Sequence, residues 1–312
     1  MSIVVIIGWI CGASCTVAAA FWAAALQRII QMQRNRPTVR RGLELPVADD
    51  PPIVSIIIPA HNEQRVIEQC VTALREQTYP ALEIIFVLDR CTDDTRELLE
   101  PHARDDERVR IIDNDSCPED WAGKCNAAAI GAKHATGDWL LFTDADTRFD
   151  PQLVRAAVAC AQDRELGLMS LLPTLTTKHH YERIAQPVAS MTLVRMFPLA
   201  RINREQRSRP FANGQFLLFD RSEYERIGGH AAVKDALLED IAFARRMSKM
   251  NGRVGVLLAD GMLTVSMYDS LEDFQRGWRR IFIEACKRRP GRMIKNAWRL
   301  LLLGVGTPIM QG

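Results

Sequence analysis

Asp144 and Asp146 are separated by one residue and follow the apolar run 139–143 directly. Two carboxylates that face one way at a strand end are hard oxygen ligands, able to hold Mg²⁺ or Mn²⁺ against a diphosphate. Turns also use aspartate freely, so the pair alone is weak evidence. It gains weight from Pro59-Ala-His-Asn-Glu63 and from Asp89, because each of these also follows an apolar run.

The apolar runs predict the elements that position these residues. β-Branched and apolar residues fill 53–58, 83–88, 109–112 and 139–143, and segments with helical spacing, such as 63–77, separate them. Strands that alternate with helices indicate a mostly parallel α/β sheet with helices on both faces. Since such sheets bind ligands at the carboxyl ends of their strands, the polar clusters at 59–63, 89–94 and 144–146 are predicted to share one site.

The chain after Asp150 has a different pattern, which predicts a second half of the same domain. Longer helices are expected at 151–162, 181–196 and 237–250, and short strands at 215–219 and 254–258. We expect this half to receive the acceptor. The predicted domains are a transmembrane anchor at 1–27, a basic, proline-rich linker at 28–52, a catalytic domain at 53–269 with halves 53–150 and 151–269, and a membrane-associated segment at 270–312.

The first apolar segment, Ile3 to Leu26, contains no charged residue and is long enough as a helix to cross a bilayer. A signal peptide is the alternative, but the basic residues expected before its apolar run are missing. Five arginines follow within 28–41, and this positive-inside bias predicts that the catalytic domain lies on the cytoplasmic side of the cytoplasmic membrane. The eight cysteines are scattered without a CxxC pair, so we expect reduced thiols.

The C-terminal region is predicted to contact the membrane as well. Residues 271–289 place Phe274, Trp278 and Phe282 on one helical face, and 270–299 contains nine Lys or Arg residues against three acids. This suits a helix on an anionic membrane surface, although a solvated helix packed on the domain has the same pattern. The apolar run 300–310 is too short to span a bilayer.

The order of these motifs resembles the family 2 glycosyltransferases of the GT-A fold, especially the branch that glycosylates membrane lipids such as ceramides, hopanoids and carotenoids. The resemblance covers roughly 53–280 and includes Trp121-Ala-Gly-Lys124-Cys-Asn126, which is similar to the family's segment beneath the nucleotide. It implies that Asp89 contacts the nucleotide base and that Asp144 and Asp146 bind the metal. The implied donor-binding residues are Pro59, His61, Asn62, Glu63, Asp89, Lys124 and Asp144.

The resemblance also assigns an acid pair in the acceptor half, which Glu239-Asp240 fits. Asp240 would be the general base, since an acceptor hydroxyl attacks well only when a carboxylate accepts its proton. Without the resemblance, two acids at a helix N-terminus, stabilised by the helix dipole, would be the simpler interpretation. The implied acceptor-side residues are Gly214, Gln215, His230, Gln275, Trp278 and Arg279. His230 also suits a structural loop histidine, and Gln275-Arg-Gly-Trp278-Arg279 reverses the family's order of Trp and Arg, which argues against processive polymer synthesis.

We therefore predict an inverting enzyme that moves a sugar from a nucleotide-sugar, expected to be a UDP-sugar, to a membrane lipid with the help of Mg²⁺ or Mn²⁺. A sugar-phosphate nucleotidyltransferase is the main alternative, because it also combines a metal with a Rossmann-like sheet. A noncatalytic membrane scaffold is a third interpretation. The net charge of +2 makes no case for nucleic-acid binding. No Gly-x-Gly-x-x-Gly or P-loop motif is present, which argues against a dehydrogenase and a P-loop enzyme.

Overall fold

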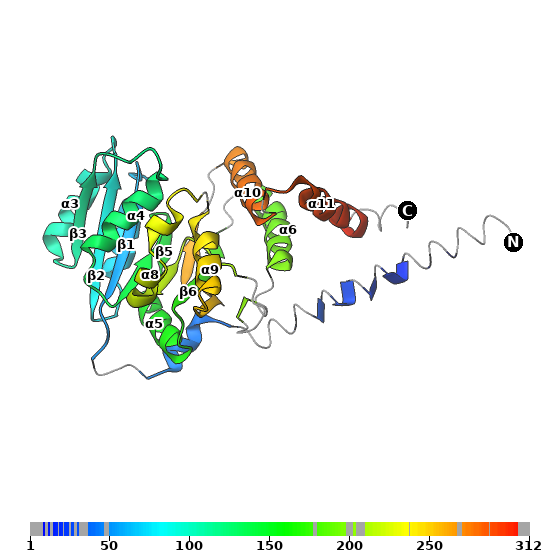
Figure 1. Cartoon of the computed structure of the whole chain (residues 1–312), viewed down its shortest axis with the longest axis horizontal. Helices are drawn as coiled ribbons and strands as arrows, with labels where there is room; N and C mark the ends of the chain where they lie inside the picture. Colours follow the sequence, from blue (N-terminus) through cyan, green and yellow to red (C-terminus); the bar gives the residue numbers. More distant parts are fainter. Residues whose placement is uncertain are drawn as a thin grey trace. The chain divides into compact units, whose positions relative to one another are not determined.

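The computed structural model in Figure 1 describes residues 37–46, 50–176, 180–197, 202–203, 210–236, 238–266, 270–286 and 288–304, with scattered residues between 9 and 30. The chain divides into two compact units: 37–269, and 1–36 together with 270–312. Most of the predicted anchor and the end of the run 300–310 lie outside the described residues. Among the residues that are described, no helix is long and apolar enough to cross a membrane.

A seven-stranded sheet in the order β3-β2-β1-β4-β8-β6-β9 forms the centre of the larger unit. Its strands are β1 (Val54–Ala60), β2 (Leu82–Asp89), β3 (Val109–Asn114), β4 (Trp139–Phe142), β6 (Leu168–Leu172), β8 (Leu217–Asp220) and β9 (Val254–Leu258). β8 runs antiparallel to both of its neighbours, whereas the other adjacent strands are parallel. The predicted mostly parallel α/β sheet is therefore confirmed.

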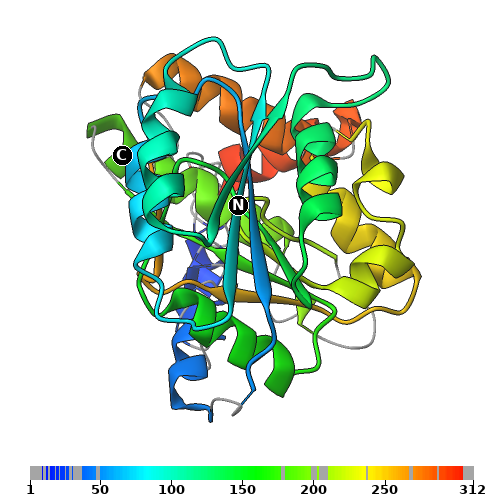
Figure 2. The same cartoon turned by 90° about the vertical axis from the view of Figure 1, so that its left-hand side faces the viewer.

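Helices cover both faces of this sheet, as Figure 2 shows for the region around β1 and β2. One face packs against α2 (Ile67–Arg75), α3 (Thr95–Asp105) and α5 (Leu153–Asp163), and the other against α4 (Gly123–His134), α8 (Arg221–Arg226) and α9 (Glu239–Lys249). The alternation of strand side chains explains the two layers, because Ile56 and Ile58 join the first core whereas Ile57 joins the second.

The helices next to the site pack closely on the strands. In α2 the buried residues Ile67, Cys70, Val71 and Leu74 follow the three- and four-residue spacing of one helical face. In α4 a Cβ atom added at Gly131 would lie 2.4 Å from Ile57 Cγ2, so glycine allows this helix to approach β1. The N-terminus of α4 is thereby held at the edge where the strands end.

The second half of the domain contains elements that the apolar pattern did not predict. β6 is one of them. A separate three-stranded sheet, in the order β5-β10-β7, was not predicted either; β10 (Leu263–Val265) and β7 (Thr174–Leu175) come from the second half, and β5 (Thr147–Phe149) from the end of the first. The predicted helix 181–196 corresponds to α6 (His180–Met196), and 237–250 to α9. Among the described residues, Cys70, Cys91, Cys117, Cys125, Cys160 and Cys286 are free cysteines; the reduced state of the thiols stays a prediction.

The folded unit begins before Ile53, within the region assigned to a linker. Residues Val39–Glu44 form the 3₁₀-helix η1, and Val39 is fully buried in the core. A Cβ atom added at Gly42 would lie 2.0 Å from the carbonyl oxygen of Ala156, so η1 packs against the backbone of α5. Two buried residues in six give no periodic signal, which is why the sequence indicated a linker here.

Within the described part of 270–304, the chain forms two helices, α10 and α11. α10 (Leu271–Ala285) ends before the basic run 287–289, and α11 (Pro290–Gly304) begins at Pro290. Proline suits the first turn of a helix but not its interior, so it starts a new helix here. Along α10, Trp278 lies near Phe274 and Phe282, with ring centroids 6.1 and 5.5 Å away. This is the aromatic face predicted for the segment.

Candidate active site

The predicted rim of polar residues forms where β1, β2 and β4 end. β1 pairs with β2 and β4 in parallel, with Ala60 opposite Leu88 and Ile57 opposite Phe142. The residues that follow these strands therefore reach the same edge of the sheet. The structure thus brings together the polar clusters that begin at His61, Asp89 and Asp144.

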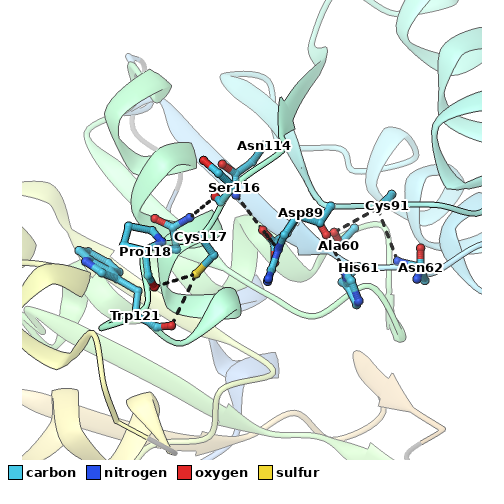
Figure 3. A network of polar contacts seen from close by, with 12 residues as sticks. Ala60, His61, Asn62, Asp89, Cys91, Asn114, Ser116, Cys117, Pro118 and Trp121 are labelled. Atoms are coloured by element: carbon cyan, nitrogen blue, oxygen red, sulfur yellow. Dashed lines mark hydrogen bonds and ion pairs between the residues drawn. The ribbon is translucent and has the colours of Figure 1, made fainter.

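The β1 and β2 ends are tied to each other. The His61 Nδ1 atom lies 2.5 Å from the carbonyl oxygen of Asp89, and the Asn62 side-chain oxygen accepts a hydrogen bond from Thr92 N at 2.8 Å. Figure 3 shows His61, Asn62 and Asp89 meeting at this edge. Asn62 has a positive φ of 58°, a conformation that asparagine tolerates better than most residues. Pro59 lies within β1, opposite Val87.

The carboxylate of Asp89 is already hydrogen-bonded. Its Oδ1 atom accepts from Asn114 Nδ2 at 2.7 Å, and its Oδ2 atom accepts from Arg90 Nη2 at 2.6 Å. Asp89 itself is only 4% exposed, whereas the Arg90 side chain is about half exposed. A nucleotide base that approaches Asp89, as the motif resemblance implies, would meet the Arg90 guanidinium as well. The sequence analysis missed Arg90 and Asn114, although Asn114 also stands at a strand end.

Asp144 and Asp146 lie where β4 ends, and Asp146 has an unpaired oxygen. Its Oδ1 atom is buried and has no hydrogen-bond partner within the described residues. Burial first, and then Asp144 and Glu63, raise the pKa of Asp146 to about 7. Burial and the charge of Asp144 also raise the pKa of Glu63. Because Glu63, Asp144 and Asp146 repel one another, a cation bound beside them would stabilise their charged forms.

These residues fit a divalent metal that is shared with a substrate. The structure forms no group of three or more His, Cys, Asp or Glu ligands among the residues it describes. Mg²⁺ is commonly bound through one or two carboxylates together with substrate phosphates, which Asp144 and the unpaired oxygen of Asp146 can supply. Both aspartates are therefore suitable ligands for such an ion.

Lys124, near the start of α4, connects the two halves of the site. Its Nζ atom lies 2.7 Å from Asp144 Oδ1 and 2.8 Å from Glu239 Oε1. Desolvation opposes the charge of this ammonium group, but the two carboxylates outweigh that effect and raise its pKa well above the usual value. The same interaction lowers the pKa of Glu239 against the effect of burial. Glu239 is thus held ionised beside Lys124.

The pKa of Asp240 lies close to neutral pH, where a carboxylate can accept a proton. Burial, followed by the charge of Glu239, raises its pKa to about 7. Its Oδ2 atom accepts a hydrogen bond from Gly214 N at 2.8 Å, and a Cβ atom added at Gly214 would lie 3.5 Å from that oxygen and 3.4 Å from Lys124 Nζ. The loop that carries Gly214 therefore lies directly against the Lys124, Glu239 and Asp240 cluster.

The sequence model of Glycosyl transferase family 2 matches residues 55–228, more than half of the chain. The chain belongs to this family. The resemblance drawn from the motifs is therefore confirmed, and the match does not favour a nucleotidyltransferase. A 4,4'-diaponeurosporenoate glycosyltransferase of Staphylococcus aureus is 27% identical over 232 residues, which are 72% of this chain and 59% of the relative. The chain thus spans less than two thirds of the curated relatives that it matches.

Solved structures of other glycosyltransferases share this fold. The mannosyltransferase PcManGT from Pyrobaculum calidifontis, in complex with GDP-Man and Mn²⁺, has a TM-score of 0.58 at 22% identity, with 95% of this chain and 83% of that chain covered. TarS from S. aureus has a TM-score of 0.52 at 18% identity, with 72% and 38% covered. These similarities establish a GT-A fold for this family 2 member.

The remaining predicted acceptor-side residues have different surroundings. Gln215 is buried, and its backbone oxygen accepts a hydrogen bond from Thr143 Oγ1 at 2.8 Å, which joins its loop to the end of β4. Its side-chain Oε1 atom is buried without a partner within the described residues. The assignment of Gln215 to the acceptor side remains a prediction.

His230 lies in the core of this family 2 domain. It is 2% exposed, its Nδ1 atom is 2.8 Å from the Tyr224 hydroxyl, and its ring packs at 4.6 Å from Phe142. Burial lowers the pKa of His230 to about 3, so the ring is neutral. This environment supports the packing role that the sequence left open, rather than contact with an acceptor.

Gln275, Trp278 and Arg279 belong to α10 in the smaller unit, where Gln275 and Arg279 are exposed and Trp278 is buried. Their assignment to the acceptor side remains a prediction.

Proposed function

We propose that the protein is an inverting glycosyltransferase that moves a sugar from a nucleotide-sugar to a membrane lipid. Membership of family 2 supports the reaction class. The observation that carries the proposal is the contact of Lys124 with both Asp144 and Glu239, at 2.7 and 2.8 Å, because it connects an acid of the proposed donor site to one of the two acids proposed for the acceptor side. A transferase needs this proximity of a leaving group and a base.

In the proposed reaction, Asp144 and Asp146 would hold a divalent metal, which stabilises the departing diphosphate when bound. Asp240 would accept the proton of the acceptor hydroxyl as that oxygen attacks the anomeric carbon. Its raised pKa of about 7 suits this task, since the carboxylate is then a stronger proton acceptor than an ordinary aspartate. The hydrogen bonds from Gly214 N and Ile241 N, at 2.8 and 2.6 Å, fix its orientation.

Direct displacement by the acceptor would invert the anomeric centre. The proposed base and the proposed metal pair come from different halves of the domain, so the acceptor would approach opposite the leaving diphosphate. An α-linked donor then gives a β-linked product without a covalent enzyme intermediate. We propose a UDP-sugar as donor on the motif resemblance alone.

We further propose a lipid-like acceptor at the cytoplasmic face of the membrane. The curated relative is named for diaponeurosporenoate, a carotenoid carboxylate. In the smaller unit, α11 exposes Met293, Ile294 and Trp298 on a helix that also carries Arg292 and Lys295. Exposed apolar residues next to basic ones suit a helix in the interface of an anionic membrane.

The proposed transfer is tested by mass spectrometry of products formed from a panel of UDP- and GDP-sugars with Mn²⁺ and a membrane lipid extract. A glycolipid that appears with one donor, and disappears when the protein is omitted, supports the proposal. Release of pyrophosphate from a nucleoside triphosphate and a sugar phosphate, with no glycolipid from any donor, would replace it with nucleotidyl transfer.

Membrane attachment is expected to resist alkaline carbonate, because removing 24 uncharged residues at 3–26 from water is strongly favourable. Without residues 1–26, the chain is expected to stay bound only at low salt, since salt screens the attraction of the basic helices for anionic lipids. Fractionation of both chains by centrifugation measures this. Full recovery of the intact chain in the soluble fraction would contradict the anchor.

Gly123→Ala is expected to weaken nucleotide binding about tenfold, the loss typical of one displaced hydrogen bond to a charged group. The added Cβ would lie 2.7 Å from Arg90 Nη2 and 2.9 Å from Asp89 Oδ2, and so would push apart the pair that we propose faces the base. Calorimetry with UDP and GDP measures the effect. Gly291→Ala is the control, as no atom lies within 4 Å of its added Cβ. Equal nucleotide affinities for the two variants would show that the Asp89–Arg90 pair does not contribute to nucleotide binding.

A further inference from the structure

Lys124 occupies an unusual place for a donor-binding residue. It is the second residue of α4, and its ammonium group contacts two carboxylates that come from other elements, Asp144 after β4 and Glu239 at the start of α9. Its side chain is still 42% exposed, so solvent reaches it and the flexible stem has room to move. An ion pair that serves only to hold a core together has no such freedom.

The surrounding charges explain why a cation is needed there. The carboxyl groups form two repelling clusters, one of Glu63, Asp144 and Asp146 and one of Glu239 and Asp240. Lys124 interacts favourably with Asp146, Glu239 and Asp240 as well as with Asp144. The charge of Lys124 therefore lowers the pKa of Asp146 on the proposed donor side and of Glu239 and Asp240 on the proposed acceptor side.

The position of the ammonium group conflicts with a metal on the same aspartate. Nζ lies 2.7 Å from Asp144 Oδ1, whereas Mg²⁺ sits at about 2.0–2.1 Å from its oxygen ligands. Two cations on one carboxylate oxygen repel each other at short range. A metal can bind Asp144 through Oδ1 only when the Lys124 ammonium group withdraws from that oxygen, and Glu239 remains available to hold the ammonium group.

We propose that Lys124 is a stand-in cation that bridges Asp144 and Glu239 in the donor-free protein and releases Asp144 when the metal and donor bind. This rests on the proposed function for the identity of the metal pair. Lys124 is thus a positioning residue: it holds Asp144 and Glu239 together before the donor binds, and its release couples donor binding to the Glu239–Asp240 pair on the proposed acceptor side. A permanent structural ion pair is the alternative, and it would not compete with the metal.

The test measures binding of Mn²⁺ alone to the full chain in detergent, by electron paramagnetic resonance of the free ion at pH 8. Lys124→Met is expected to bind Mn²⁺ at least about tenfold more tightly than the natural chain, because the competitor is gone and the carboxylates are left uncompensated. Lys124→Arg keeps the charge and should remain within a few-fold of the natural affinity. Lys133→Met, an exposed lysine on the same helix, is the matched control and should not differ from it.

Thermal unfolding gives a second readout that does not depend on a fully stable variant. In EDTA, Lys124→Met should melt below the natural chain, and saturating Mn²⁺ should raise its melting temperature by more than that of the natural chain. Unchanged or weaker Mn²⁺ binding by Lys124→Met, or a smaller Mn²⁺ stabilisation, would overturn the stand-in role. Mn²⁺ binding and thermal unfolding do not require sugar transfer. Mass spectrometry of the products made by the natural chain therefore tests the proposed function separately.

Discussion

Asp240→Asn is expected to lower the rate of sugar transfer by about 10² to 10⁴-fold, the range typical for loss of a general base. Donor binding should change little, because the proposed base acts on the acceptor. Initial rates with saturating donor, together with calorimetric titration of the nucleotide, separate the two effects. Asp235→Asn is the matched control, as Asp235 is exposed and five residues away along the chain. An equally severe loss of nucleotide binding would make Asp240 a structural residue.

The same residue predicts the pH dependence. A base must be ionised to act, so kcat/KM should rise with pH through about 7 and level off above it, following the raised pKa of Asp240. The charge of Glu239 contributes to that rise of the pKa, second to burial. In Glu239→Gln the midpoint of the profile should therefore move to lower pH. A midpoint that stays in place would show that Asp240 does not titrate in the rate-determining step.

Asp146→Asn is expected to weaken metal-dependent nucleotide binding by at least about 100-fold, beyond the cost of losing a residue that only supports a ligand. The variant should still fold, because the Asp146 Oδ1 atom has no hydrogen-bond partner to lose within the described residues. Removing one negative charge beside Asp144 and Glu63 should even raise the melting temperature in EDTA. Titration of UDP with and without Mn²⁺, with Asp163→Asn as an exposed control, measures the effect.

Two outcomes would contradict the metal pair. One is nucleotide binding by the natural chain that persists unchanged in excess chelator. The other is an Asp146→Asn variant that melts lower than the natural chain in EDTA, since a role in folding would then explain its loss of binding.

The strands of the first half, 53–150, were predicted well because β1, β2 and β4 are continuous apolar runs that end in polar residues. β1, β2 and β4 lie within a few residues of their expected bounds. β6 was missed because Leu168–Leu172 is short, and its buried Ser170 interrupts the apolar pattern. That serine hydroxyl accepts a hydrogen bond from Asn213 N at 2.8 Å, a tertiary contact that no local pattern reveals.

The candidate site was predicted as a set of residues but not as a network. Strand ends placed Asp89, Asp144 and Asp146 on one edge, because the ends of parallel strands meet there. The bridge from Lys124 to Glu239 joins positions 115 residues apart, and the covering of Asp89 by Arg90 depends on side-chain direction. Such pairings are set by tertiary packing and by charge balance, neither of which residue spacing determines.

The order of strands in the sheet bears on how the chain is made. β6 lies between β8 and β9, and both of these strands follow it in the chain. β8 leaves the ribosome roughly 45 residues after β6, a delay of a few seconds at about 5–20 residues per second. During that interval Leu168–Leu172 has no strand of the finished sheet to pair with, and β4 still lacks its partner β8. The nascent chain therefore carries a half-built sheet with an apolar edge, a state in which chaperones or slower translation would favour recovery of the folded protein.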